Sequence, residues 1–165
     1  MKIVNSTLAC TTVPLIQVHP AKLKHAQGFP KFPGHKVRFS DWTFMFFTSG
    51  RFNILGLKRL DLLDIVEDAM TEYLSSCCYP VAIKIRVANV VFFESYNGRI
   101  NLRECFSMLK DEYKCVLELE FYPALRVHNG WCALIYQSGK IIVTGTTEVE
   151  KSLCHLTEIV HKCMI

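Results

Sequence analysis

The chain has 165 residues, 50% of them hydrophobic and 21% charged, a composition that can fill a core and excludes a disordered chain. A net charge of +4 is compatible with a polyanionic partner without establishing one. The apolar runs 44–47 and 87–93 are too short to cross a bilayer, and no N-terminal leader marks the chain for secretion. The eight cysteines are therefore expected to be reduced thiols of an intracellular protein.

In the first half, the sequence predicts mainly strands followed by a helix. Strands are expected at residues 3–10, 36–39, 42–47 and 52–55, with turns at 40–41 and 49–50, and a helical stretch that Pro20 disturbs at 15–26. An amphipathic helix should begin near Asp61, its expected N-cap, and end before Pro80. Its inward face is predicted to hold Leu62, Ile65, Val66, Ala69, Met70 and Tyr73.

The second half repeats this order of strand, helix, strands and helix. A strand is expected at 81–93, a helix at 101–109 capped by Asn101, and further strands at 116–121, 125–127, 131–136 and 141–144. The first helix should turn Leu102, Cys105, Phe106 and Leu109 inward, and the closing helix Val149, Leu153, Leu156, Val160 and Met164. With the helices on one side of an antiparallel sheet, the predicted fold class is α+β.

An internal duplication is visible in the sequence. Trp42, Ser49, Gly50 and Gly56 return 89 positions later as Trp131, Ser138, Gly139 and Gly145. A fixed offset at four identical residues indicates two repeats, which we place at residues 1–79 and 80–165, related by a pseudo-two-fold axis. Function is therefore expected on a surface that both repeats build.

The sheet face turned away from the helices is predicted to be apolar. If Phe44, Phe46, Phe52 and Ile54 point toward the helices, then Met45, Phe47, Asn53 and Leu55 point away, because alternate strand residues face opposite sides. In the second half, Ile135, Ile141 and Val143 should point inward, and Leu134, Tyr136, Ile142 and Thr144 outward. Such a face is either an interaction surface or is covered by the chain itself or by a second copy in a homodimer.

Catalytic and metal-binding patterns are weak. His155, His161, Cys154 and Cys163 crowd the end of the chain, but without the paired spacing that zinc sites use. There is no glycine-rich phosphate loop and no nucleophile elbow. We therefore predict neither a metal, nor a cofactor, nor an enzyme.

Several of these motifs resemble the TATA-box-binding protein (TBP) family. The strand, Ser-Gly-Lys turn and Thr-Gly strand end of that family resemble residues 135–145 and, more loosely, 46–56. Its Phe-Pro-Gly motif is similar to Phe32-Pro33-Gly34 and Tyr122-Pro123-Ala124, and its first strand to residues 3–7. The resemblance covers essentially the whole chain.

The resemblance implies a saddle, in which a curved antiparallel sheet binds the DNA minor groove and four helices lie on the convex face. It implies four intercalating aromatic wedges: Phe32, Phe47, Tyr122 and Tyr136. The implied groove face holds Ile3, Asn5, Thr7, Met45, Asn53, Leu55, Asn89, Val91, Leu134, Ile142 and Thr144. The implied phosphate contacts are Lys31, Lys36, Arg38, Arg51, Lys58, Arg126 and Lys140.

The chain also departs from the family. The first-strand asparagine of the second repeat is kept as Asn89, whereas Ile3 is expected at that position in the first repeat, with Asn5 and Asn53 as replacement polar contacts. Leu55 replaces the threonine of the first Thr-Gly pair, and tyrosines replace the second pair of phenylalanines. We expect a protein that reads DNA shape, with a weakened or asymmetric preference for TATA-like sites.

Two partner surfaces are implied. Glu118 and Glu120 lie where the family's carboxyl-terminal stirrup binds transcription factor IIB, so a factor-IIB-like partner and the RNA polymerase machinery are expected. The helix within residues 61–74 carries Asp61, Asp64, Glu67, Asp68 and Glu72, which would attract a basic partner if they do more than face solvent.

Two functions are left open by the sequence. One is a transcription initiation factor that binds and bends AT-rich double-stranded DNA, acting in the nucleus or another intracellular site of transcription. The other is a protein-interaction module that keeps the fold with weak or no TATA binding. The compact and divergent sequence looks like that of a viral or parasite relative.

Overall fold

The chain folds into two compact units, each an antiparallel sheet with helices. The computed structural model describes residues 1–39, 41–147 and 151–165. The first unit comprises residues 4–88, and the second comprises residues 1–3 and 89–165. Residue 40 of the predicted turn at 40–41 lies outside the described residues, and so does the predicted core residue Val149. The side chain of Phe32 is likewise not described.

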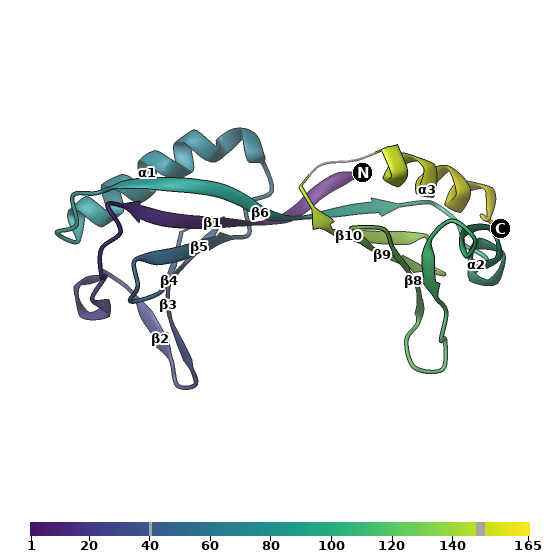
Figure 1. Ribbon diagram of the computed structural model, residues 1–165, viewed down its shortest axis with the longest axis horizontal. Coiled ribbons are helices and arrows are strands. Elements are labelled where there is room, and N and C mark those ends of the chain that lie inside the picture. Colours follow the sequence, from purple (N-terminus) through teal and green to yellow (C-terminus); the bar gives the residue numbers. More distant parts are fainter. Residues whose placement is uncertain (40, 148–150) are drawn as a thin grey trace. The chain divides into compact units, whose positions relative to one another are not determined.

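The first unit is a sheet in the strand order β2-β3-β4-β5-β1, with one α-helix along it (Figure 1). Its strands are β1 (Lys2–Val13) from residue 4 on, β2 (Gln27–Phe29), β3 (Phe32–Arg38), β4 (Thr43–Phe46), β5 (Arg51–Leu55) and residues 82–88 of β6 (Ala82–Ser95). Helix α1 (Leu63–Ser76) follows the short 3-10 turn η2 (Leu60–Leu62). The predicted strands are therefore present in this unit, with extended bounds for β1 and β3.

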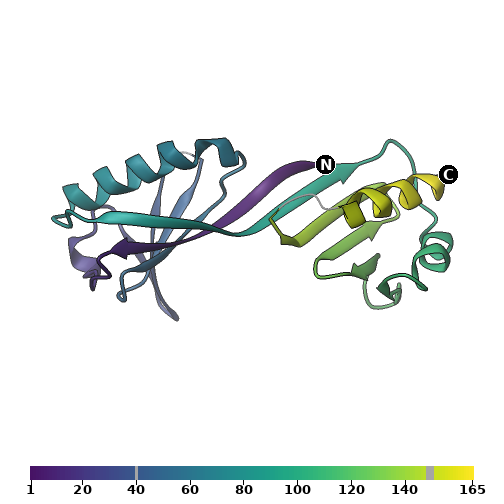
Figure 2. The same cartoon turned by 45° about the horizontal axis from the view of Figure 1, so that its top comes forward.

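The second unit has the strand order β6-β10-β9-β8-β7 and carries two α-helices (Figure 2). Its strands are residues 89–95 of β6, β7 (Lys114–Val116), β8 (Ala124–His128), β9 (Cys132–Tyr136) and β10 (Lys140–Thr146). Its helices are α2 (Leu102–Leu109) and α3 (Lys151–Lys162). The side chain of Asn101 accepts a hydrogen bond from the Glu104 backbone N–H, which confirms Asn101 as the N-cap of α2.

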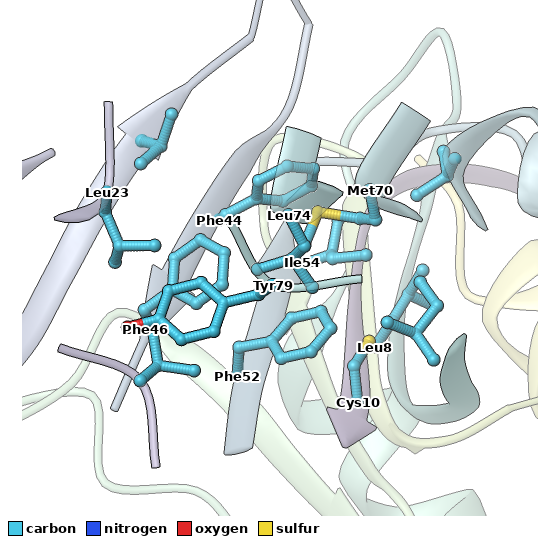
Figure 3. Close-up of a cluster of buried hydrophobic side chains, with 14 of the residues drawn as sticks. Leu8, Cys10, Leu23, Phe44, Phe46, Phe52, Ile54, Met70, Leu74 and Tyr79 are labelled. Atoms are coloured by element: carbon cyan, nitrogen blue, oxygen red, sulfur yellow. The ribbon is translucent and has the colours of Figure 1, made fainter. Parts of the chain in front are cut away.

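The core of the first unit lies between its sheet and α1. Phe44, Phe46, Phe52 and Ile54 are at most 1% exposed, so the predicted inward face of β4 and β5 is confirmed. Figure 3 shows these side chains gathered with Met70 and Leu74 of α1. In the second unit the same role falls to a set that includes Leu125, Ile135, Ile141, Val143, Leu153, Leu156 and Val160. Alternate strand residues point to the other face of each sheet, and the helices do not cover that face (Figure 1 and Figure 2).

The predicted helix at residues 15–26 is wrong. The segment contains only the 3-10 turn η1 (Pro20–Lys22), so the described residues hold three α-helices and not four. Pro20 lacks a backbone N–H, and the Val18 N–H donates to Thr48 O, which holds the chain extended before the turn. His25 then adopts a positive φ of 60°, which is incompatible with a continuing helix.

Four smaller expectations also differ from the structure. Asp61 lies in η2 and pairs with Arg59, so it does not cap α1. On α1, Ile65 is 62% exposed and Leu74 is buried in its place, because the buried positions follow Val66 and Met70. Met164 lies beyond α3 in a bridge to Ile100. The predicted strand at 116–121 ends at residue 116.

The predicted strand at 116–121 stops at residue 116 because the chain turns at Glu118. Its carbonyl accepts hydrogen bonds from the N–H groups of both Phe121 and Tyr122, at 3.0 and 2.9 Å. These bonds fold the segment back before β8, so it projects as a loop. None of the helices in the described part of the chain is long and apolar enough to span a membrane.

Candidate nucleic-acid interface

The outer face of the first unit, opposite α1, is formed by side chains from adjacent strands. Leu55 pairs with Thr7 on β1 and with Thr43 on β4, and Asn53 pairs with Met45. Residues directly opposite in an antiparallel pair point to the same face. All five side chains are half-buried although no helix covers them. The predicted groove-face residues Thr7, Met45, Asn53 and Leu55 therefore do share one surface.

At one end of this surface the sheet is hollowed. The hollow has a volume of about 500 Å³, and its lining includes Phe47, Arg51, Asn53 and Arg86. Arg86 was not among the predicted contacts. The signal was present in the sequence, since Lys84 and Arg86 alternate with Ile83 and Ile85 along β6. A wedge candidate and two guanidinium groups thus line the same hollow.

The outer face of the second unit has the same construction. Ile142 pairs with Leu134 and with Phe93, and Leu134 pairs with Arg126 on β8. Val91 and Thr144, also predicted for the groove face, are half-buried, and so is Ile3 on β1. Arg126 therefore lies on the same face as the apolar residues.

Two asparagines occupy equivalent places in the two units. Asn5 Oδ1 accepts the N–H of Gly56 at 3.0 Å, and Asn89 Oδ1 accepts the N–H of Gly145 at 2.9 Å. Gly56 and Gly145 are repeat partners, so Asn5, and not Ile3, is the counterpart of Asn89. The prediction that the first repeat lacks this asparagine is wrong, because the first strands repeat at a shorter spacing than the hairpins.

These bonds fix the orientation of both amides. A backbone N–H can only donate, so the atom that faces it must be the side-chain oxygen. Asn89 Oδ1 accepts a second hydrogen bond from the Thr144 hydroxyl at 3.1 Å. Each amide therefore turns its NH₂ group away from the glycine, and no acceptor for either NH₂ is present among the described residues.

The wedge candidates of the second unit touch each other. The hydroxyls of Tyr122 and Tyr136 lie 3.1 Å apart. This hydrogen bond, followed by burial, raises the pKa of Tyr136. In the first unit, Phe47 is half-buried, and its N–H donates to Arg51 O to close the β4–β5 turn. The wedge pair of the second unit is thus polar at its tip.

The predicted phosphate contacts fall into two groups. Lys31, Arg38, Arg51, Lys58 and Lys140 are exposed and have no ion pair within the described ranges. Lys36 and Arg126 are engaged. Lys36 Nζ lies 5.2 Å from the ring centre of Phe29, and Arg126 Nη2 donates to Glu118 Oε2 at 2.9 Å. Arg126 is the predicted contact most restrained by its neighbours.

The loop before β8 carries the two acids predicted to bind a partner. Glu118 is tied to Arg126, whereas Glu120 is exposed. Between them lies Leu119, and next to Glu120 lies Phe121, which is 84% exposed. These residues line a hollow of about 320 Å³ together with Arg103 and Leu117. The exposed apolar side chains were not predicted, since an alternating strand was expected there.

The family of the chain is indicated by the sequence of its second repeat. Residues 84–162 match the family described as transcription factor TFIID or TATA-binding protein, TBP. This repeat belongs to the TBP family. The structure of the chain is similar to that of Methanococcus jannaschii TBP, with a TM-score of 0.76, 24% identity and coverage of 98% of this chain and 97% of the other. No curated protein sequence matched the chain.

Together these findings confirm the assignment to the TBP family that the motifs predicted. At 24% identity the structural match shows the TBP fold, while the sequence match carries the family. The TBP family consists of DNA-binding transcription factors and not of enzymes. In the part of the chain that the structure describes, no three His, Cys, Asp or Glu side chains come together as a metal site.

Proposed function

We propose that this TBP-family protein binds AT-rich double-stranded DNA through its outer sheet faces and bends it to initiate transcription. The observation that carries the proposal is the pair of oriented amides on Asn5 and Asn89. In the minor groove, A·T and T·A pairs present only acceptors, adenine N3 and thymine O2. Two fixed NH₂ donors on apolar faces are complementary to that pattern, and a G·C pair adds a donor that opposes them.

Bending is the part of the proposal that rests on the aromatic residues. As in the TBP family, rings inserted between base steps at the ends of the site would kink the duplex, at an unstacking cost of a few kcal/mol per step. Phe32 and Phe47 would act in the first repeat, and Tyr122 and Tyr136 in the second. The exposed cations near these rings would bind phosphates and make the affinity salt-dependent.

Exchanging Asn5 and Asn89 for aspartate tests the amide donors. Asn5→Asp with Asn89→Asp keeps an oxygen for the glycine N–H groups but replaces each NH₂ by a charged oxygen that repels the groove acceptors. We expect affinity for an AT-rich duplex to fall by about tenfold or more per site, the loss typical of one disrupted base contact. Fluorescence anisotropy with a labelled duplex measures this.

The control is Asn129→Asp, which adds one of these two negative charges in an exposed turn of the second unit. It should bind the duplex about as well as the wild-type protein, within the effect expected of one distant surface charge. Equal binding by the double aspartate variant and this control would remove the amides from the proposed interface.

The loop before β8 is proposed to bind a factor-IIB-like protein. Glu120 and the exposed Phe121 offer a charge and an apolar anchor side by side, a combination suited to a basic surface with an apolar pocket. We expect Glu118→Lys with Glu120→Lys to weaken capture of a purified factor-IIB-like protein by about tenfold or more, through repulsion of that basic surface. Glu158→Lys, on the exposed side of α3, is the control. Unchanged capture would disprove this contact.

A second candidate function is favoured by the same loop. Its exposed apolar side chains and the engagement of Arg126 by Glu118 also suit a protein-interaction module that has lost the groove. Failure to bind AT-rich DNA, with capture of the factor-IIB-like protein intact, would select this function. In either case the site of action would be the nucleus or another place of transcription inside the cell, and a homodimer is proposed to cover the apolar faces before DNA binds.

A further inference from the structure

The tips of the two tyrosine rings in the second unit form one polar group. Tyr136 lies on the outer face of β9, and its strand partner Ala124 is two residues after Tyr122, which brings the two rings together. Their hydroxyls are 3.1 Å apart. This hydrogen bond, followed by burial, raises the pKa of Tyr136, and either hydroxyl can be its donor.

Tyr122 is also held from its ring face. The guanidinium carbon of Arg126 lies 5.8 Å from the Tyr122 ring centre, within the range of a cation–π contact. Glu118 fixes that guanidinium through a 2.9 Å hydrogen bond. The buried Arg126 Nε has no hydrogen-bond partner among the described residues, so the contacts with Glu118 and the Tyr122 ring are the ones that orient this side chain. The tyrosine pair is therefore positioned before any DNA arrives.

The hydrogen-bonding capacity of this pair is not exhausted. Each tyrosine hydroxyl offers one donor and accepts through its lone pairs, and the mutual bond uses one donor and one acceptor. One O–H and several lone pairs remain. A G·C pair places the guanine N2–H₂ donor in the minor groove, next to the acceptors that all pairs present. A phenyl ring covering that donor leaves it unpaired, whereas a hydroxyl can accept from it.

We propose that Tyr122 and Tyr136 are specificity-determining residues that admit a G·C pair at the base step opened by the second repeat. The inference rests on the proposed function. The counterparts in the first repeat, Phe32 and Phe47, carry no hydroxyl, so the step opened there must remain A·T. Such an asymmetry gives the protein one preferred orientation on a site with a G·C pair at one end only.

Three duplexes test the proposal: one with an all-A·T site, one with a G·C pair in the terminal step at one end, and one with G·C at both ends. The wild-type protein should bind the first two within about twofold of each other. It should bind the third about fivefold more weakly, because one G·C pair must then meet the phenylalanine end; a factor of this size corresponds to one net hydrogen bond.

The Tyr122→Phe, Tyr136→Phe variant removes only the two oxygens. It should bind the all-A·T duplex as the wild-type protein does, and should lose about fivefold on the duplex with one G·C end. Tyr96→Phe is the matched control, because Tyr96 packs against His161 of α3 and is remote from the outer face. Equal thermal melting of the three proteins shows that folding is unchanged.

Two results would overturn the inference, and they are distinguishable. If wild type and the double phenylalanine variant discriminate among the three duplexes equally, the hydroxyls do not set specificity, while DNA binding itself stands. If the wild-type protein binds none of the duplexes, the proposed function fails together with this inference.

Discussion

Replacing Phe47 and Tyr136 by alanine is expected to weaken binding to an AT-rich duplex by about a hundredfold or more. Stacking of a base on an aromatic ring contributes about 1–3 kcal/mol, and the double variant removes one ring from each end of the proposed site. The loss should appear mainly as faster dissociation, because the phosphate contacts that drive association are retained. Stopped-flow fluorescence with a labelled duplex measures both rates.

Phe121→Ala is the control for this variant. The Phe121 side chain is 84% exposed, and it lies in the loop proposed to bind a protein partner. Its removal should leave DNA affinity within about twofold of the wild-type value, as expected for a surface residue outside the interface. An equal loss in both variants would argue that the rings act through stability and not through insertion.

Replacing Gly139 by alanine is expected to destabilise the second unit by about 3 kcal/mol or more. Gly139 has a positive φ of 83°, and a Cβ there would lie 2.5 Å from Tyr96 O and 2.6 Å from Gly98 O. Backbone carbonyls cannot move aside as a flexible side chain does. Its repeat partner Gly50 meets the same restriction, with Ile16 O at 1.9 Å from the added carbon. Urea denaturation monitored by tryptophan fluorescence gives the free energy of unfolding.

Gly130→Ala separates the clash from the backbone conformation. Gly130 also has a positive φ, of 70°, but a Cβ there would have nothing within 4 Å. Its replacement should therefore lower the free energy of unfolding by only about 1 kcal/mol, the cost of placing alanine in the left-handed region. If both variants lost the same stability, the carbonyl contacts around Gly139 would carry no weight.

The features that the sequence predicted well are those governed by local periodicity. The alternation in residues 44–55 identified which side chains of β4 and β5 are buried, and the outward set was correct as well. Asn101 was recognised as a cap because an asparagine before a helical period has a specific hydrogen-bonding role. Local patterns suffice where neighbours along the chain determine the contact.

The errors arise where a hydrogen-bonding partner outside the apolar pattern decides the local structure. Residues 15–26 have an apolar pattern that favours a helix, but the hydrogen bond from Val18 N–H to Thr48 O draws them toward the β4–β5 turn. Asp61 has the chemistry of a cap, yet Arg59 binds its carboxylate in η2. Neither competing partner is visible in a pattern of period 3.6.

In the candidate site, too, local motifs were predicted from the sequence, whereas contacts between separate segments were not. The wedge and groove residues were proposed from motifs. Asn5 was predicted as a replacement polar contact and not as the counterpart of Asn89, because the 89-residue offset does not apply to the first strand. Arg126 was predicted to contact phosphate from its charge, and its hydrogen bond to Glu118 could not be predicted because the loop before β8 brings the two together. The contact between Tyr122 and Tyr136 depends on strand register, which the sequence alone does not specify.

Binding and bending of AT-rich DNA by the two outer faces can be measured directly. Energy transfer between dyes at the two ends of one short AT-rich duplex reports the bend, with a G·C-rich duplex of equal length for comparison. We predict that the wild-type protein raises the transfer efficiency of the AT-rich duplex, while the Phe47→Ala, Tyr136→Ala variant does not. No change in transfer at protein concentrations that saturate the duplex, or an equal rise for both duplexes, would contradict the proposed function.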